Sequence, residues 1–433
     1  MKKTFQRNDP CSRRAFVCGA AKSFLGLGAM PLLSNLAHSA EQAGLGLSKD
    51  AKAKSVIYLF MNGGMSHLDT FDTKPGAETQ GPVESIKTNV EGIQISEYFP
   101  RMAEQMDKVA IINSMRSTQG AHEQGRYYMH TSYVMRGTVS HPDIGAWSAF
   151  HLEKLNASLP ANVKIGGNSA GLGGGFLESQ FAALPIGNPE EGLKNSRLPR
   201  YISDARLARR LQRVELMNQS FNARYDNKLS RAYAQMYDDA VRLMKSEDLK
   251  AFDLNQESAE IRDRYGRNSF GQACLLARRL VEHGVRFIEI DHGGWDTHND
   301  NFNQVRNRGA VLDQGMAALL ADLTSRGMLD ETLVVLATEF GRTPTIVEDR
   351  SGRNHYPQAF TCLMAGGGVK GGFRHGMTDK EGREILTQPV EIPDFNATIA
   401  HALGIPLDKE VYSPSMRPFR VADKGEPVLE LFA

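Results

Sequence analysis

Carboxylate and imidazole side chains are concentrated in four short segments of this chain. These segments run from Asn62 to Asp72, from Asp291 to His298, from Glu339 to Thr343 and from Gly352 to Pro357. Carboxylates supply oxygen ligands and neutral imidazoles supply nitrogen ligands, and this mixture suits zinc, manganese or a related divalent ion better than calcium. The candidate ligands are Asp296, His298, Glu339, His355, Asp69, Asp291 and His292. Their concentration favours one shared polar or metal site over four unrelated structural loops.

Each of these residues, taken alone, also has a purely structural interpretation. Asp69 lies in a segment that could simply form a turn, because Asp favours turns. His298 could be an imidazole held within a capped loop. Arg342 and Arg116 could clamp an anionic group, since a guanidinium forks onto two oxygens, or could pair with neighbouring carboxylates such as Glu339. Both interpretations stay open at this level.

Buried strands are expected to position the four segments. Apolar runs predict strands at 56–61, 109–113, 285–290, 332–338 and 360–365, and helical spacing predicts helices at 269–283, 305–326 and 394–403. Strands that alternate with helices predict an α/β fold, with a doubly wound, largely parallel sheet flanked by helices. Working residues in such sheets lie in loops past the carboxyl ends of the strands. We expect an insertion of loops and helices at about 155–265, with long amphipathic helices in 203–250.

The N-terminal 40 residues have the pattern of a twin-arginine secretion signal. Paired arginines in the segment Ser12–Val17 precede an apolar stretch rich in small residues, and Ala37-His38-Ser39 resembles a signal-peptidase site. Pro31 and several glycines disfavour a membrane-spanning helix here. We therefore expect export to the periplasm or the cell exterior, followed by a single folded domain at 41–433.

Composition excludes several classes of function. The 51 basic residues balance 50 acidic ones, which gives no footprint for nucleic acid, and no apolar stretch beyond the signal is long enough to cross a bilayer. Cys11 and Cys18 fall within the signal. Cys274 and Cys362 are expected to be core residues, although one disulfide between them is conceivable. The oligomeric state cannot be inferred from the sequence.

Several longer motifs resemble a known family. They are "LFMNGGMSHLDTFDTKPG", "GGWDTHNDN", "LDQGMAALLADLTSRGMLDETLVVLATEFGRTP", "GRNHYPQAF" and "MAGGGVKGG". Residues 55 to about 410 are similar to domain-of-unknown-function family 1501, which is grouped with the alkaline phosphatase and sulfatase superfamily. The resemblance implies a doubly wound α/β fold and, in active members, metal-assisted hydrolysis of phosphate or sulfate esters of small molecules or polysaccharides.

The resemblance also implies roles for particular residues. The stretch "VVLATEFGR" places Glu339 where a metal-binding acid belongs, and Phe340 replaces a His or Asn. His355 matches a lone histidine ligand. Asp296 and His298 resemble an earlier acid-plus-histidine pair, with Asp291 or His292 as alternatives, and Asp69 is among the few acids after the first strand.

The nucleophile is less well defined by the same resemblance. The corresponding segment is 114–133, and its candidates are Ser117, Thr118 and His122. The Cys-x-Pro-Ser-Arg motif of sulfatases is absent, so ordinary sulfatase chemistry is not expected. The alternative to a hydrolase is an exported, non-catalytic binding or scaffold protein that kept the fold and lost part of the site.

Overall fold

A computed structural model describes residues 51–167, 173–194, 196, 201–222, 224 and 238–432. The predicted secretion signal lies outside the described residues, as do parts of the predicted insertion at 155–265.

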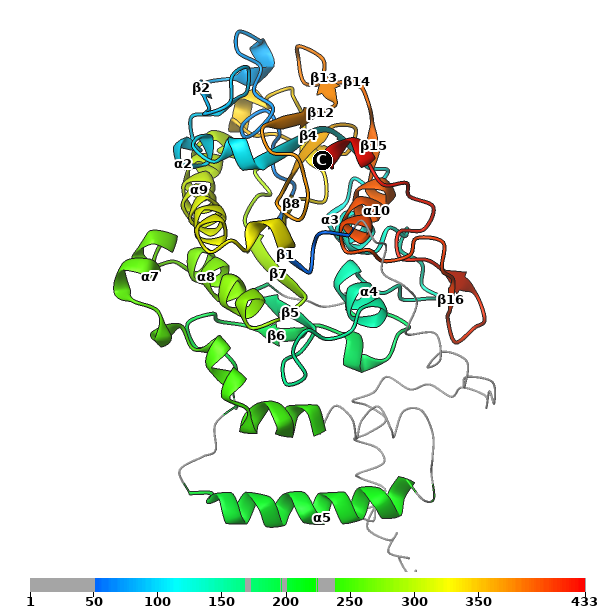
Figure 1. Ribbon diagram of the computed structural model, residues 1–433. Helices are drawn as coiled ribbons and strands as arrows, with labels where there is room; N and C mark the ends of the chain where they lie inside the picture. The colour runs from blue at the N-terminus through cyan, green and yellow to red at the C-terminus, as the bar shows by residue number, and fades with distance from the viewer. Residues whose placement is uncertain are drawn as a thin grey trace, which may run out of the picture. The chain divides into compact units, whose positions relative to one another are not determined.

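The core of the described chain is a nine-stranded sheet (Figure 1). Its strands are β1 (Ser55–Asn62), β4 (Val109–Arg116), β5 (Asn162–Ile165), β6 (Leu184–Ile186), β7 (Phe287–Gly293), β8 (Thr332–Ala337), β11 (Phe360–Ala365), β12 (Phe373–His375) and β15 (Val390–Glu391). The spatial order is β12-β4-β11-β8-β1-β7-β5-β6, and β15 also pairs with β4. Strand β1 therefore lies inside the sheet, between β8 and β7.

Most neighbouring strands of this sheet are parallel. Strand β1 runs parallel to β7 and β8, β5 runs parallel to β6 and β7, and β4 runs parallel to β12 and β15. The exception is β11, which is antiparallel to both β4 and β8. The chain reaches β11 from β8 through residues 338–359, which hold a hairpin and one 3-10 turn but no α-helix, and an antiparallel pair needs no helical crossover.

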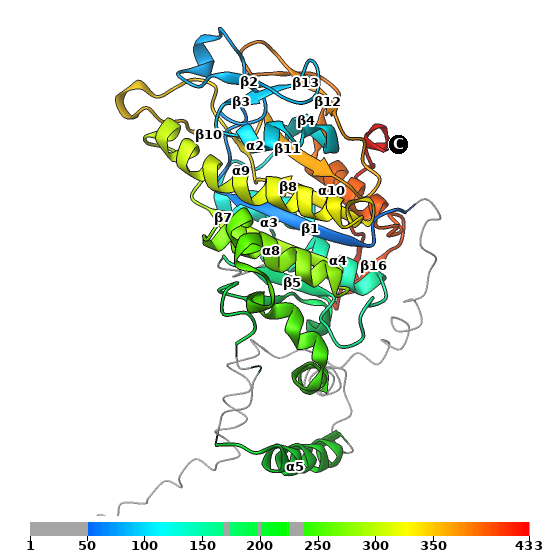
Figure 2. The same ribbon diagram turned by 60° about the vertical axis from the view of Figure 1, so that its left-hand side comes forward.

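Both faces of the sheet are buried under helices (Figure 2). One face is covered by α8 (Ser269–Glu282) and α9 (Asn301–Ser325), with the short α2 (Pro100–Ala103) beside them, and the other by α3 (His122–Thr131), α4 (Ile144–His151) and α10 (Ile392–Ala402). Alternate residues of β1 divide between the faces, since Ile57 and Leu59 join one cluster and Val56 and Tyr58 join the other. A strand buried on both sides needs a continuous apolar run. The predicted doubly wound, largely parallel α/β fold is confirmed.

Other elements lie outside this sheet and the helices that cover it. They are β2 (Ser85–Lys87) with β3 (Gln94–Ser96), β9 (Gly341–Arg342) with β10 (His355–Tyr356), β13 (Met377–Thr378) with β14 (Ile385–Thr387), β16 (Val411–Tyr412) with β17 (Pro418–Phe419), α5 (Asp204–Asn222) and α7 (Ala259–Tyr265). The hairpin β9–β10 matters most for the site, because it pairs Arg342 with His355.

The two cysteines of the folded region do not form a disulfide. Cys274 in α8 and Cys362 in β11 are buried free thiols, and they belong to the clusters on opposite faces of the sheet. Burial raises the pKa of the Cys362 thiol to about 12, so it stays protonated. Within the described residues, no helix combines the length and apolar character that a bilayer span requires.

Candidate metal centre

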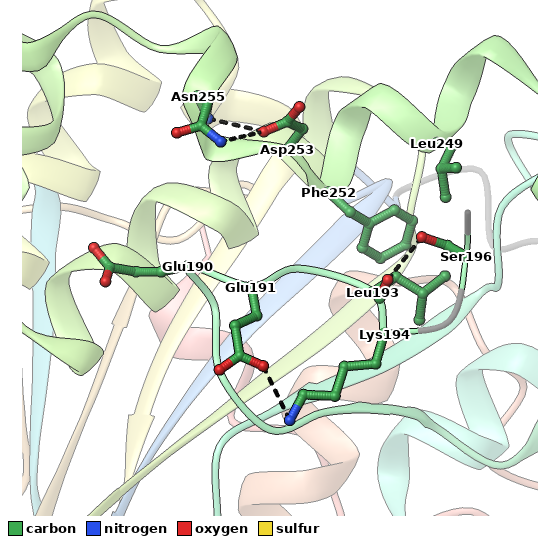
Figure 3. Close-up of a pocket in the computed structure, with 9 residues that line it drawn as sticks. All are labelled: Glu190, Glu191, Leu193, Lys194, Ser196, Leu249, Phe252, Asp253 and Asn255. Atoms are coloured by element: carbon green, nitrogen blue, oxygen red, sulfur yellow. Dashed lines mark hydrogen bonds and ion pairs between the residues drawn. The ribbon is translucent and has the colours of Figure 1, made fainter. Parts of the chain in front are cut away.

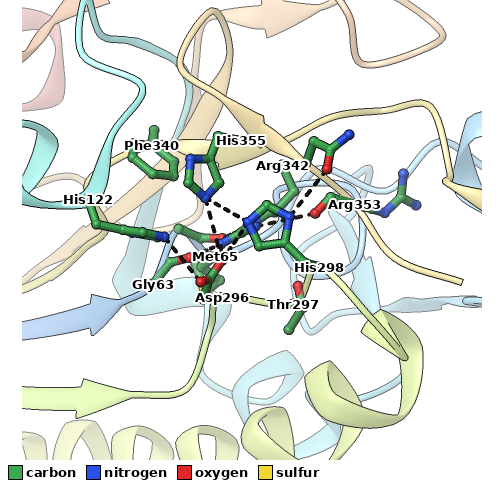
Figure 4. Close-up of polar contacts among 12 residues, drawn as sticks. Gly63, Met65, His122, Asp296, Thr297, His298, Phe340, Arg342, Arg353 and His355 are labelled. Carbon is green, nitrogen blue, oxygen red and sulfur yellow. Dashed lines mark hydrogen bonds and ion pairs between the residues drawn. The ribbon is translucent and has the colours of Figure 1, made fainter. Parts of the chain in front are cut away.

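Four potential ligands converge past the carboxyl ends of the central strands (Figure 4). His122 is the first residue of α3, Asp296 and His298 lie in the loop after β7, and His355 is the first residue of β10. One ligand atom from each lies within 4.8 Å of all the others. The fold thus unites four side chains from three separate parts of the sequence.

The distances within this group are those of atoms arranged around a common point. The Nε2 atoms of His298 and His355 lie 2.9 Å apart. Oδ1 of Asp296 lies 3.1 Å from Nε2 of His298 and 3.5 Å from Nε2 of His355, and Oδ2 lies 3.3 Å from Nε2 of His122. Ligands about 2.0 Å from a tetrahedral zinc ion stand about 3.3 Å from one another. Three of these four spacings lie within about 0.2 Å of that value, and the His298–His355 spacing is about 0.4 Å shorter.

The hydrogen bonds behind the rings fix which nitrogen faces the centre. Nδ1 of His122 lies 2.9 Å from Oε1 of Glu339, and Nδ1 of His355 lies 2.8 Å from the carbonyl oxygen of Gly120. Oε1 of Glu339 also accepts a hydrogen bond from the Gly63 backbone N–H, and the Gly120 carbonyl oxygen can only accept, so both Nδ1 atoms donate. Nε2 of each neutral ring therefore presents its lone pair to the centre.

The third ring follows the same pattern. Nδ1 of His298 lies 3.2 Å from Oδ1 of Asn354, and the same oxygen accepts a 2.6 Å hydrogen bond from Arg350, which sets the orientation of the amide. Three imidazole lone pairs and one carboxylate thus point at the same region. A proton shared by His298 and His355 would satisfy only that pair, whereas a metal ion would satisfy all four groups.

Two of the four potential ligands, His355 and Asp296, have lowered pKa values, which favours their unprotonated forms. Burial lowers the pKa of His355, and the nearby Arg342 guanidinium adds to this effect. Burial alone would raise the pKa of Asp296, but the hydrogen bond and charge of Arg342 bring it below its usual range. The hydrogen bond that His122 donates to Glu339 raises the pKa of His122 despite burial, so a proton competes for this ring more strongly.

Glu339, predicted to be a ligand, is not a member of the converging group and contacts it through His122. Its side chain is fully buried, and Oε1 accepts hydrogen bonds from Nδ1 of His122 and from the backbone N–H of Gly63, both at 2.9 Å. Phe340 packs its ring against His122 and His355, with centroids 5.1 and 4.7 Å away. Glu339 thus orients His122 by a hydrogen bond, and Phe340 packs against His122 and His355 by apolar contact.

Three other predicted ligands are not members of the group. Asp69 is fully buried and forms an ion pair with Arg353, with N–O distances of 2.8 and 3.0 Å. Asp291 accepts a 3.2 Å hydrogen bond from Asn62. His292 packs between Phe270 and Trp295, and burial lowers its pKa to about 4.

The position of Asp291 and His292 has a simple cause. Strand β7 extends to Gly293, beyond the predicted end at Ile290, so both residues are strand residues. Only Asp296 and His298 lie in the loop that follows.

Two of the three predicted nucleophiles, Ser117 and Thr118, form hydrogen bonds with Gln119 and are not members of the converging group. The Ser117 hydroxyl accepts a 3.0 Å hydrogen bond from the Gln119 backbone N–H, and the Thr118 hydroxyl accepts one of 2.9 Å from the Gln119 side chain. Both precede Gly120, whose carbonyl holds His355. Arg116, a predicted anion clamp, forms an ion pair with Glu391.

His122 enters the site as a potential ligand, whereas the sequence suggested it only as a nucleophile candidate. No local motif marks this role, because its partner Glu339 is 217 residues away in the chain. Only the packing of α3 on the sheet brings them together.

A cavity of about 530 Å³ lies elsewhere in the fold (Figure 3). It is lined by Glu190, Glu191, Leu193, Lys194, Ser196, Leu249, Phe252, Asp253 and Asn255. Glu191 pairs with Lys194 at 3.0 Å and Glu190 pairs with Arg262 at 2.8 Å. These carboxylates have counter-ions and do not converge as the metal-centre residues do.

Comparison with known proteins gives a family and several similar folds. Residues 53–432 match the model of a family described as "Protein of unknown function (DUF1501)", and no curated protein matches the chain. The lipoteichoic acid synthase LtaP from Listeria monocytogenes is 9% identical, with 89% of this chain and 81% of that chain covered and a TM-score of 0.41. A protein in the alkaline phosphatase superfamily from Vibrio parahaemolyticus is 9% identical, with coverages of 89% and 72% and a TM-score of 0.39. The phosphonate monoester hydrolase SpPMH from Silicibacter pomeroyi is 12% identical, with coverages of 88% and 76% and a TM-score of 0.38.

Proposed function

The chain belongs to the DUF1501 family, and we propose that it is an exported, metal-dependent hydrolase of phosphate or sulfate esters. One observation carries this proposal: the Nε2 atoms of three imidazoles converge on the Asp296 carboxylate, while the Nδ1 atom of each ring is engaged by an acceptor on its far side. Such a set of donors suits a divalent ion, with zinc or manganese the best candidates.

The ion would be held by His122, Asp296, His298 and His355. When bound, it supplies Lewis acidity toward a phosphoryl or sulfuryl oxygen and lowers the pKa of water. The protein itself orients the three imidazoles. Glu339 accepts a hydrogen bond from His122, the Asn354 amide oxygen faces His298, and the Gly120 carbonyl oxygen faces His355.

Charge and exposure support an anionic ester as substrate. Asp296 and Glu339 carry two negative charges and Arg342 carries one positive charge, so a divalent ion gives the centre a net charge of about +1. The centre is open to solvent, since the side chain of Asp296 is 48% exposed and that of His298 is 33% exposed. The anionic group of the ester can therefore approach the ligands directly. Its alcohol part, even one as large as a polysaccharide, can stay in solvent.

Ser117 and Thr118 are the nucleophile candidates within this proposal. Both lie between β4 and α3, two or three residues before the Gly120 carbonyl that holds His355. The variants Ser117→Ala and Thr118→Ala separate them, because loss of the nucleophile abolishes turnover and leaves metal affinity unchanged.

Hydrolysis assays on metal-depleted protein test the proposal. We would strip the purified protein with a chelator, reload it with Zn²⁺ or Mn²⁺, and assay aryl phosphate monoesters, phosphate diesters and sulfate esters. Activity should vanish on stripping, return on reloading and be absent in His298→Ala, while the control His401→Ala behaves as wild type. Metal binding without turnover of any of these esters would contradict the hydrolase and favour the non-catalytic binding protein.

Export by the twin-arginine route is the second part of the proposal. It rests on the paired arginines Arg13 and Arg14 and on the apolar stretch that follows them. Replacing both arginines by lysine should retain the protein in the cytoplasm, as measured by cell fractionation. Unchanged export of that variant would contradict the route.

A further inference from the structure

We infer that Arg342 is a positioning residue of the metal centre, one that sets the geometry of the ligands and does not bind substrate. This inference rests on the proposed metal-binding function. It differs from the role suggested by the sequence, in which Arg342 clamps an anionic ester.

The contacts of Arg342 prevent it from clamping a substrate anion with two N–H donors. Its side chain is fully buried. Nε donates to the carbonyl oxygen of Gly64 at 2.8 Å, Nη1 donates to that of Arg353 at 3.3 Å, and Nη2 donates both to that of Gly63 and to Oδ1 of Asp296, the latter at 2.6 Å. All but one of the N–H donors of the guanidinium are thereby engaged by the protein itself.

These contacts tie together the loops that carry the ligands. Arg342 bonds directly to Asp296 in the loop after β7, and it is the cross-strand partner of His355 in the β9–β10 hairpin. It also bonds the carbonyl of Gly63, whose own N–H donates to Glu339, the residue that holds His122. One side chain thus supports three of the four potential ligands.

The bond to Asp296 sets the rotation of its carboxylate. Because Oδ1 is held at 2.6 Å by Arg342, that oxygen faces His298 and His355, and Oδ2 faces His122. Without the guanidinium the carboxylate is free to rotate about its terminal bond, and the two oxygens lose their fixed places among the imidazoles.

Lysine cannot reproduce this arrangement. It keeps the positive charge but has a compact ammonium group, which cannot reach acceptors on both sides of a planar fork at once. The variant Arg342→Lys therefore separates the charge of Arg342 from its geometry.

The test compares Arg342→Lys with Arg278→Lys. Arg278 is a matched control, because it is also buried and pairs with two carboxylates, Glu257 at 3.0 Å and Asp322 at 2.9 Å. Glu257 lies just before α7 and Asp322 lies in α9, so neither belongs to the metal centre. For each full-length mature protein we would measure Zn²⁺ affinity against a chromogenic chelator, the visible absorption spectrum of the Co²⁺-loaded form, and the affinity for inorganic phosphate at saturating Zn²⁺.

The positioning role gives a definite pattern. Arg342→Lys should weaken Zn²⁺ binding about 10- to 100-fold and change the Co²⁺ spectrum, as loss of a ligand-supporting contact does. Arg278→Lys should lose thermal stability and keep both metal readouts. If Arg342→Lys does not fold, Arg342→Gln, which keeps an amide donor, takes its place.

Two results would overturn the inference, and they are distinguishable. In the first, Arg342→Lys keeps the wild-type Zn²⁺ affinity and Co²⁺ spectrum but binds phosphate more weakly. That result would show that Arg342 binds the substrate anion and does not position the ligands. A wild-type protein that binds no Zn²⁺ would overturn the metal centre itself and the proposed function with it.

Discussion

His298 and His355 face each other across the centre with their Nε2 atoms 2.9 Å apart, while each Nδ1 is engaged by an acceptor on the far side of its ring. The two residues come from different loops, 57 residues apart in the chain. Two neutral imidazoles in this arrangement direct lone pair against lone pair, which is unfavourable unless a cation lies between them. This relationship supports the proposed metal centre over a chance meeting of polar loops.

The support that Glu339 gives to His122 can be measured through metal affinity. In Glu339→Gln the buried carboxylate that accepts from His122 and from Gly63 becomes a neutral amide, so the ring loses its charged acceptor. Zn²⁺ affinity should fall about 10-fold or more, the usual effect of losing an acceptor behind a ligand. The exposed Glu348→Gln serves as the control. Equal Zn²⁺ affinity in both variants would show that the hydrogen bond does not contribute.

Gly63 allows the backbone to pass close to Asp296. Its φ is +128°, and a Cβ there would lie 2.4 Å from the backbone nitrogen of Asp296. Gly76 also has positive φ, at +86°, but a Cβ there would meet nothing within 4 Å. Gly76→Ala should therefore cost only the backbone strain, about 1–2 kcal/mol of unfolding free energy.

Gly63→Ala should cost more than Gly76→Ala, because a steric clash adds to the strain, and it should also weaken Zn²⁺ binding by displacing Asp296. Denaturant titrations and chelator competition measure the two effects. Equal losses of stability in the two variants, with metal binding intact, would show that the loop can move aside.

A buried cluster of charged side chains around Glu289 predicts how the free energy of unfolding changes at acid pH. Oε1 of Glu289 lies 2.6 Å from Nζ of Lys164 and 3.0 Å from Nε2 of His130. Burial opposes ionisation, but these two partners outweigh it and bring the pKa of Glu289 down to about 2. Because the folded pKa lies below the unfolded one, the stabilisation is complete above about pH 4.5 and is lost as the pH falls toward 2.

Denaturation of the metal-free protein tests this dependence. The free energy of unfolding of wild type should exceed that of Glu289→Gln near neutral pH, and the gap should narrow between about pH 5 and pH 2.5, by on the order of 3 kcal/mol in total. A gap that stays constant over this range would mean that Glu289 does not titrate with a lowered pKa in the folded state.

The elements of the fold were largely predictable, because their signals are local. The run from Val56 to Met61 predicted β1, and the spacing of Leu312, Met316, Leu319 and Leu323 predicted α9. Both strand faces are buried in this sheet, so apolar runs mark the strands directly. The reversed direction of β11 was not predicted, since direction depends on the length and path of the connection and leaves no mark in the strand.

The site was predictable only in part. Asp296, His298 and His355 follow or begin strands, and their residue types alone suggest ligands. The roles of His122 and Glu339 depend on a contact between residues far apart in the chain, and the engagement of Arg342 depends on backbone carbonyls that any residue would carry. Neither kind of contact is visible in the sequence.

The metal content of the protein tests the central claim most directly. Wild type and the double variant His298→Ala/His355→Ala would be purified without chelator, equilibrated with Zn²⁺ or Mn²⁺, freed of excess ion by gel filtration and analysed for metals, with circular dichroism to verify the fold. The convergent geometry predicts one divalent ion per wild-type chain and none in the double variant. Wild-type protein that retains no ion, or a folded double variant that retains the same amount, would contradict the metal centre.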